Sequence, residues 1–311
     1  MTRRFLAPGC ALALAGLLTT GAAAATPTRP AIELNADGPR PGVHGIIDVE
    51  HLMEDVDCET SQLAGPAATS TAHLTGAKAI SLDVLVLVDV ARGAEIAATR
   101  DRKAREAAER KLYASVRKSL IVGTTSYDPL DITLKYDDFA LLQPLVKGKP
   151  RVRTDDPEKI IALAKTQLGG KRRGDVDVVY VVTDRDLRVA GFGNAVAGLA
   201  DCIGGVALPD RAFAVGETGV LTDDGGRGIG PVTFYKDLTA KIAAHEIGHL
   251  FGGHHHYQEC GTAAPTAVGR GELGPCTLMT NAADFQTFPF STLNSIVVRG
   301  HAEKWAVATD K

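Results

Sequence analysis

A run rich in Val, Leu and Ile, ISLDVLVLVDV, occupies residues 80–90 and predicts a strand that is buried on both faces. Two further runs, LDITLKY at residues 130–136 and VDVVYVVTD at residues 176–184, predict two more strands. The third run is as apolar as the first. Strands of this kind are typical of a sheet that is covered on both sides by other elements.

Between these strands the apolar positions change to helical spacing. In residues 101–123 an apolar residue recurs every four positions, with Arg, Lys and Glu between, as in an amphipathic helix. These positions are Ala104, Ala108, Leu112, Val116 and Leu120. Residues 157–168 predict a second helix, which Asp156 caps and which ends at Gly169 and Gly170. The alternation predicts an α/β fold with a twisted, mostly parallel sheet and helices packed on its faces.

The first quarter of the chain lacks this pattern. Arg3 and Arg4 precede an apolar stretch too short to span a bilayer comfortably, and four alanines follow at residues 22–25. This order predicts a secretory signal peptide over residues 1–25, with an uncleaved membrane anchor as the alternative. Residues 26–78 are rich in Pro, Gly, Ser and Thr, which is typical of a linker, a propeptide-like leader or a loosely packed arm. We therefore expect a secreted protein, extracellular or, in a Gram-negative bacterium, periplasmic.

Composition narrows the possible partners. The 311 residues are 45% hydrophobic and 23% charged, and the formal net charge is −3. The absence of a basic excess argues against nucleic acid as a partner. No segment after the signal peptide is apolar and long enough to cross a bilayer, so we expect no membrane contact once it is removed.

Four cysteines follow the signal peptide, whereas Cys10 lies within it. An even number in an exported protein favours two disulfides, and free buried thiols are the alternative. Cys260 and Cys276 close a short loop and form the predicted pair, which leaves Cys58 with Cys202. A Cys58 thiolate in the leader could instead ligate a metal ion.

Residues 191–232 are rich in glycine and predict loops and short edge strands. The segment GFGNAVAG loosely resembles a dinucleotide fingerprint, but no strand leads directly into it. Asp223 and Asp224 could ligate calcium, but the pattern favours an exposed turn. Calcium is therefore possible but unsupported.

Residues 245–256, HEIGHLFGGHHH, carry the candidate chemistry. His245 and His249 stand four residues apart on a predicted helix, so both imidazoles can bind one Zn²⁺. Glu246 lies about 100° around the helix and can reach a water on the metal without ligating it. Gly252 ends the helix and lets the chain turn, so that His255 can return as a third ligand. Three imidazoles leave a fourth position open, as in a catalytic zinc site.

The complete pattern, H-E-x-x-H-x-x-G-x-x-H, resembles that of the metzincin zinc endopeptidases. In CTLMT, Met279 matches the Met-turn, which implies an apolar floor below the imidazoles. PLDIT, AGLADCIGG, FSTLNS and Cys260 resemble segments of the adamalysin or ADAM-type (reprolysin-like) branch. The chain departs from that branch at His256, where an acid is usual, and it lacks a C-terminal cysteine.

The resemblance implies a catalytic domain over residues 79–311, with an upper subdomain (79–252), an active-site helix and a small lower subdomain (253–311). It implies that a substrate binds as an extended strand against the sheet edge. The segment between GLADCIGG and the zinc helix is expected to supply that edge strand, and the Cys260–Cys276 loop is expected to wall the specificity pocket.

The sequence thus predicts a secreted zinc-dependent endopeptidase that binds one catalytic zinc, acts on protein or peptide substrates and is a monomer. Zinc activates water, and Glu246 takes its proton and passes it to the leaving amine. The alternatives are a non-catalytic binding or metal-carrying protein on the same scaffold, and a His-rich metal sponge. Glu246 argues against a pure zinc holder, and the spacing of Gly248, Gly252 and Met279 argues against a sponge.

Overall fold

The computed structural model describes residues 78–189, 195–218, 236–255, 277–279 and 289–307. The expected signal peptide and leader lie outside these residues, as do Asp223, Asp224, His256, Cys58, Cys260 and Cys276. Predictions that concern them stay predictions. Among the described helices, none is long and apolar enough to cross a membrane.

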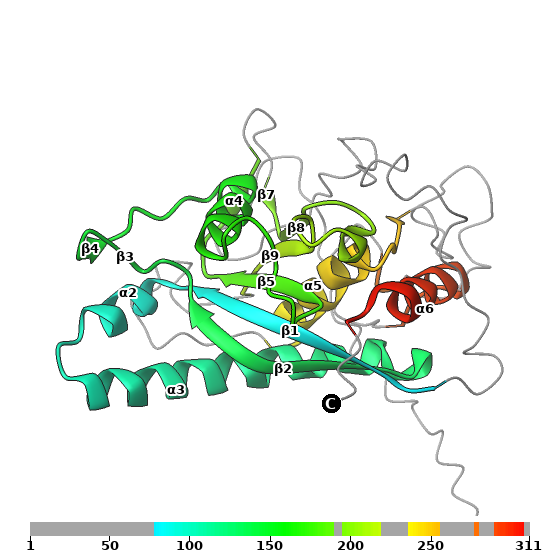
Figure 1. The fold of residues 1–311 in the computed structure, drawn as a ribbon, viewed down its shortest axis with the longest axis horizontal. Helices are drawn as coiled ribbons and strands as arrows, with labels where there is room; N and C mark the ends of the chain where they lie inside the picture. The colour runs from blue at the N-terminus through cyan, green and yellow to red at the C-terminus, as the bar shows by residue number, and fades with distance from the viewer. Residues whose placement is uncertain (1–77, 190–194, 219–235, 256–276, 280–288, 308–311) are drawn as a thin grey trace, which may run out of the picture. The chain divides into compact units, whose positions relative to one another are not determined.

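A five-stranded sheet forms the centre of the fold, in the order β2-β1-β5-β9-β8 (Figure 1). Four neighbouring strands are parallel, and only β8 runs antiparallel to its neighbour β9. The strands are β1 (Ile80–Asp89), β2 (Ile132–Leu141), β5 (Val178–Thr183), β8 (Gly198–Ala200) and β9 (Phe213–Glu217). This arrangement confirms the predicted α/β fold with a mostly parallel sheet.

Helices cover both faces of the sheet, and short elements connect them. The α-helices are α2 (Ala91–Ala98), α3 (Arg102–Leu120), α4 (Pro157–Gln167), α5 (Lys236–Leu250) and α6 (Thr292–Trp305). The short helices are η2 (Ile121–Ser126), η3 (Asp128–Leu130) and η4 (Gly205–Ala207), and the short strands are β3 (Leu145–Val146), β4 (Lys149–Pro150), β6 (Leu187–Arg188) and β7 (Ala195–Val196).

Alternation along the strands divides the core between the two faces. In β1, Val84 and Val86 point into the core that contains residues of α3, α5 and α6, whereas Leu85 and Leu87 point into the core beneath α4. Asp156 caps α4 as predicted, because its carboxylate accepts a hydrogen bond from the Lys159 amide. The sheet therefore separates the helix that carries the histidines, α5, from α4.

The expected edge strand is the one topological prediction that the structure corrects. Of the segment between GLADCIGG and the zinc helix, the structure describes residues 206–218, and the strand among them is β9, which lies inside the sheet between β5 and β8. The edge strand is β8, within GLADCIGG itself. The reason is pairing: β9 extends the parallel sheet from β5, and β8 then pairs with it in the opposite direction.

Helix α6 is held against the start of the sheet by a buried guanidinium. Arg299 is 1% exposed, and its nitrogens donate hydrogen bonds to the carbonyl oxygens of Leu130 (2.6 Å), Asp131 (3.1 Å) and Lys78 (2.6 Å). Its Nε also pairs with Glu303 on the same helix, at 2.9 Å. A planar group with five donors suits this task, because it can satisfy several carbonyl groups at once. Arg299 thus fixes α6 relative to β1 and β2.

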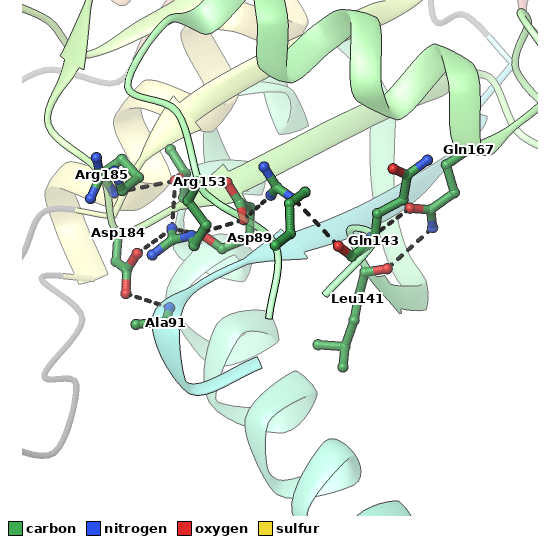
Figure 2. Close-up of polar contacts among 10 residues, drawn as sticks. Asp89, Ala91, Leu141, Gln143, Arg153, Gln167, Asp184 and Arg185 are labelled. Carbon is green, nitrogen blue, oxygen red and sulfur yellow. Dashed lines mark hydrogen bonds and ion pairs between the residues drawn. The ribbon is translucent and has the colours of Figure 1, made fainter. Parts of the chain in front are cut away.

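A buried ion network closes the other end of β1 (Figure 2). Asp89 accepts hydrogen bonds from Arg151 (2.6 Å) and Arg153 (3.0 Å), and Arg153 also pairs with Asp184. Asp184 in turn accepts a hydrogen bond from the Ala91 amide at the start of α2. The two arginines follow β4, so the network ties this segment to the carboxyl ends of β1 and β5.

Candidate metal centre

The histidines at positions 245, 249 and 255 converge in one cluster. Their Nε2 atoms lie 3.0 Å apart in each of the three pairs. Tetrahedral zinc with Zn–N bonds of about 2.0–2.1 Å separates its ligands by roughly 3.3 Å, so the cluster is close to the required size. Among the described residues, this is the one group of His, Cys, Asp or Glu side chains that could hold a metal ion.

Hydrogen bonds to carbonyl oxygens explain why these nitrogens suit a cation. The His245 Nδ1 atom lies 2.8 Å from the Leu278 oxygen, and the His249 Nδ1 atom lies 2.7 Å from the Gly253 oxygen. A carbonyl only accepts, so each Nδ1 carries the hydrogen and each neutral ring presents its Nε2 lone pair to the cluster. Lone pairs that face one another at 3.0 Å repel. A cation between them removes the repulsion, so the donor set fits zinc.

Burial and the neighbouring rings favour the neutral form of the His249 imidazole. Burial lowers the pKa of His249 well below its usual value, and the neighbouring rings of His255 and His245 lower it further. Metal ligation requires a neutral imidazole. His249 is therefore ready to ligate without first losing a proton at neutral pH.

The turn after α5 returns the third histidine. Gly252 has a φ of +86°, its amide donates to the His249 oxygen, and the Gly253 amide donates to the Gly248 oxygen. These two bonds form the Schellman motif, in which a left-handed residue ends a helix. A side chain at Gly252 would also collide with α6, since its Cβ would lie 2.6 Å from a His301 ring atom. Glycine at this position thus permits both the turn and the close packing of α6.

The Met279 side chain packs beneath the helix. It is fully buried, and a Cβ at Gly248 would lie 2.9 Å from its sulfur atom. The neighbouring residue, Leu278, supplies the carbonyl that orients His245. This short segment therefore supports the histidine cluster both by packing and by a directed hydrogen bond.

Glu246 lies on the side of α5 that faces the edge strand. It is 7% exposed, and its carboxylate packs against Gly198 of β8. A Cβ at Gly198 would lie 2.4 Å from Oε1 of Glu246. The Glu246 carboxylate occupies space that is available only because residue 198 has no side chain.

The buried side chain of Tyr180 interacts electrostatically with the Glu246 carboxylate. Burial raises the pKa of Tyr180 well above its usual value, and the negative charge of Glu246 raises it further. Its hydroxyl packs over Gly216, where a Cβ would lie only 2.1 Å away. Gly198 and Gly216 are paired residues of β8 and β9. Because neither has a side chain, Gly198 leaves room for the Glu246 carboxylate and Gly216 for the Tyr180 hydroxyl.

Several contributors have no signal in a single sequence. Gly198 is one of many glycines in a segment that predicts loops and short edge strands, and the Leu278 carbonyl is a backbone group that every residue has. Cys202 is buried and disulfide-bonded. Since the other four cysteines lie outside the described residues, the predicted pairing stays a prediction.

The fold and the three-histidine cluster together define a metallopeptidase. Residues 130–256, from the end of η3 to the residue after the third histidine, match the model of the reprolysin-like metallopeptidase family M12B. This chain carries a reprolysin-like M12B metallopeptidase domain. No curated protein matches it significantly.

Proposed function

We propose that this protein is a secreted zinc-dependent endopeptidase in which Glu246 is the general base. The observation that carries the proposal is the cluster of three Nε2 atoms at 3.0 Å, two of them with lone pairs fixed inward by carbonyl partners. The signal-peptide pattern of residues 1–25 supports export.

The residues divide the chemistry between them. His245, His249 and His255 would hold a single zinc ion, which when bound acts as a Lewis acid on water and on the scissile carbonyl. Glu246 takes a proton from water at its carboxylate and later passes that proton to the leaving amine. Because this carboxylate is nearly buried against Gly198, it is held in place before a substrate arrives.

Strand β8 offers backbone groups to an extended substrate. The Ala197 oxygen and the Asp201 amide bond inward to β9, so the intervening residues Gly198 and Ala200 direct their N–H and C=O groups to the outer edge. A peptide that pairs with this edge would lie beside Glu246, because Gly198 contacts its carboxylate. Pairing through the backbone gives affinity with modest demands on substrate sequence.

Cleavage of casein by the purified secreted protein tests the proposed function. We expect cleavage that a zinc chelator abolishes and that added zinc restores. Tightly bound zinc without cleavage would contradict the proposal and would favour a metal-carrying scaffold. Several weakly bound metal ions without cleavage would favour a metal sponge.

Substitution of Gly198 by alanine should impair the base without removing the metal. The new methyl group would collide with the Glu246 carboxylate and displace it, and a shift of about 1 Å in a catalytic group can cost about 100-fold in rate. We expect kcat on a peptide to fall by about 10–100-fold, with zinc content unchanged. Gly174→Ala is the matched control, because a Cβ there meets nothing within 4 Å. Equal kcat in both variants would disprove the positioning of Glu246 by Gly198.

A further inference from the structure

The third histidine, His255, lies five residues beyond the end of α5. His254 precedes it, and both of its backbone groups bond to one side chain. The His254 amide donates to Oδ1 of Asn294 at 2.8 Å, and Nδ2 of Asn294 donates to the His254 oxygen at 3.0 Å. The Asn294 side-chain amide thus holds both peptide planes that meet at the His254 Cα. The second of these planes leads directly into His255.

Asn294 is itself held firmly. It is fully buried, and its backbone N–H donates a hydrogen bond of 3.2 Å to the hydroxyl of Ser291, the residue that caps α6. The same helix is fixed to the sheet by Arg299. A continuous series of contacts therefore links the start of β1 and β2, through α6, to the peptide that precedes the third histidine.

We infer that Asn294 is the positioning residue for the third metal ligand, His255. The inference rests on the proposed zinc site. The side-chain amide of Asn294 satisfies both backbone groups of His254 at once, whereas a carboxylate cannot donate and an aliphatic side chain can neither donate nor accept. Asn294→Asp keeps one acceptor but sets a carboxylate oxygen against the His254 carbonyl, and Asn294→Leu keeps the shape without either bond.

Zinc affinity of the purified protein, measured by competition with a chelator of known affinity, tests this role. We expect Asn294→Asp and Asn294→Leu each to weaken zinc binding by about 10–100-fold, the usual effect of losing a partner that orients a ligand. Asp101→Ala is the control for general destabilisation. It removes the cap of α3, whose carboxylate accepts a 2.9 Å bond from Ala104, and should leave zinc affinity unchanged.

A double-mutant cycle with His255→Ala separates positioning from a merely structural role. If Asn294 acts through His255, Asn294→Leu should weaken zinc binding in the parent but cause no further loss in the His255→Ala background. Equal losses in both backgrounds would overturn the inference, as would parental affinity in both Asn294 variants or an equal loss in Asp101→Ala. A parent protein that binds no zinc would instead overturn the proposed function.

Discussion

Replacement of Glu246 by glutamine should reduce peptide hydrolysis by about 100- to 10,000-fold, the usual contribution of a general acid–base residue. Glutamine keeps the shape that packs against Gly198 but cannot take a proton from water. Because the three histidines are unchanged, the variant should bind zinc as the parent does. The measurements are kcat on a fluorogenic peptide and zinc content of the same sample.

A matched variant, Glu95→Gln, controls for loss of one negative charge, because Glu95 is exposed on α2. It should retain parental activity. Full activity in Glu246→Gln would show that another group takes the proton, whereas joint loss of zinc and activity would leave no separate role for Glu246 as a base.

Replacement of His249 by alanine should remove both the metal and the activity. His249 is 1% exposed and contributes one of the three clustered Nε2 atoms. Loss of a partner that merely orients a ligand costs about 10–100-fold in metal affinity, so loss of a ligand should cost more than about 100-fold. Chelator competition gives the affinity, and hydrolysis should be absent at zinc concentrations that saturate the parent.

His301→Ala provides the control for removal of a buried imidazole. His301 lies on α6, 9% exposed, with its Nδ1 atom 3.0 Å from the Val297 oxygen. Its substitution should lower stability while zinc affinity stays near that of the parent. If His249→Ala bound zinc as tightly as His301→Ala does, the assignment of the ligands would be wrong.

The periodicity of apolar residues was sufficient to predict the layered fold. The observed ends of β1, β5, α3 and α4 lie within a few residues of the ends that the sequence pattern predicts. The spacing of the histidines on one helix face likewise singled out the residues that the structure brings together. Both signals are local, because they depend on contacts within one helix or strand and on the solvent exposure of alternate positions.

Features that depend on contacts between distant segments could not be predicted in this way. Strand β8 has three residues, two of them Gly198 and Ala200, so its sequence carries little strand signal, and its edge position follows only from pairing with β9. Asn294 is 40 residues from His254 in the sequence. Nothing in the identity of an asparagine indicates which backbone it will bind.

The most direct test of the central claim is titration of zinc into the metal-free protein while peptide hydrolysis is recorded. Activity should rise in proportion to added zinc and reach its plateau at one zinc ion per chain, because the described part of the chain contains one cluster of three imidazoles that could hold the metal. Hydrolysis that proceeds equally well without metal, or a fully zinc-loaded protein that cleaves no peptide, would contradict the account.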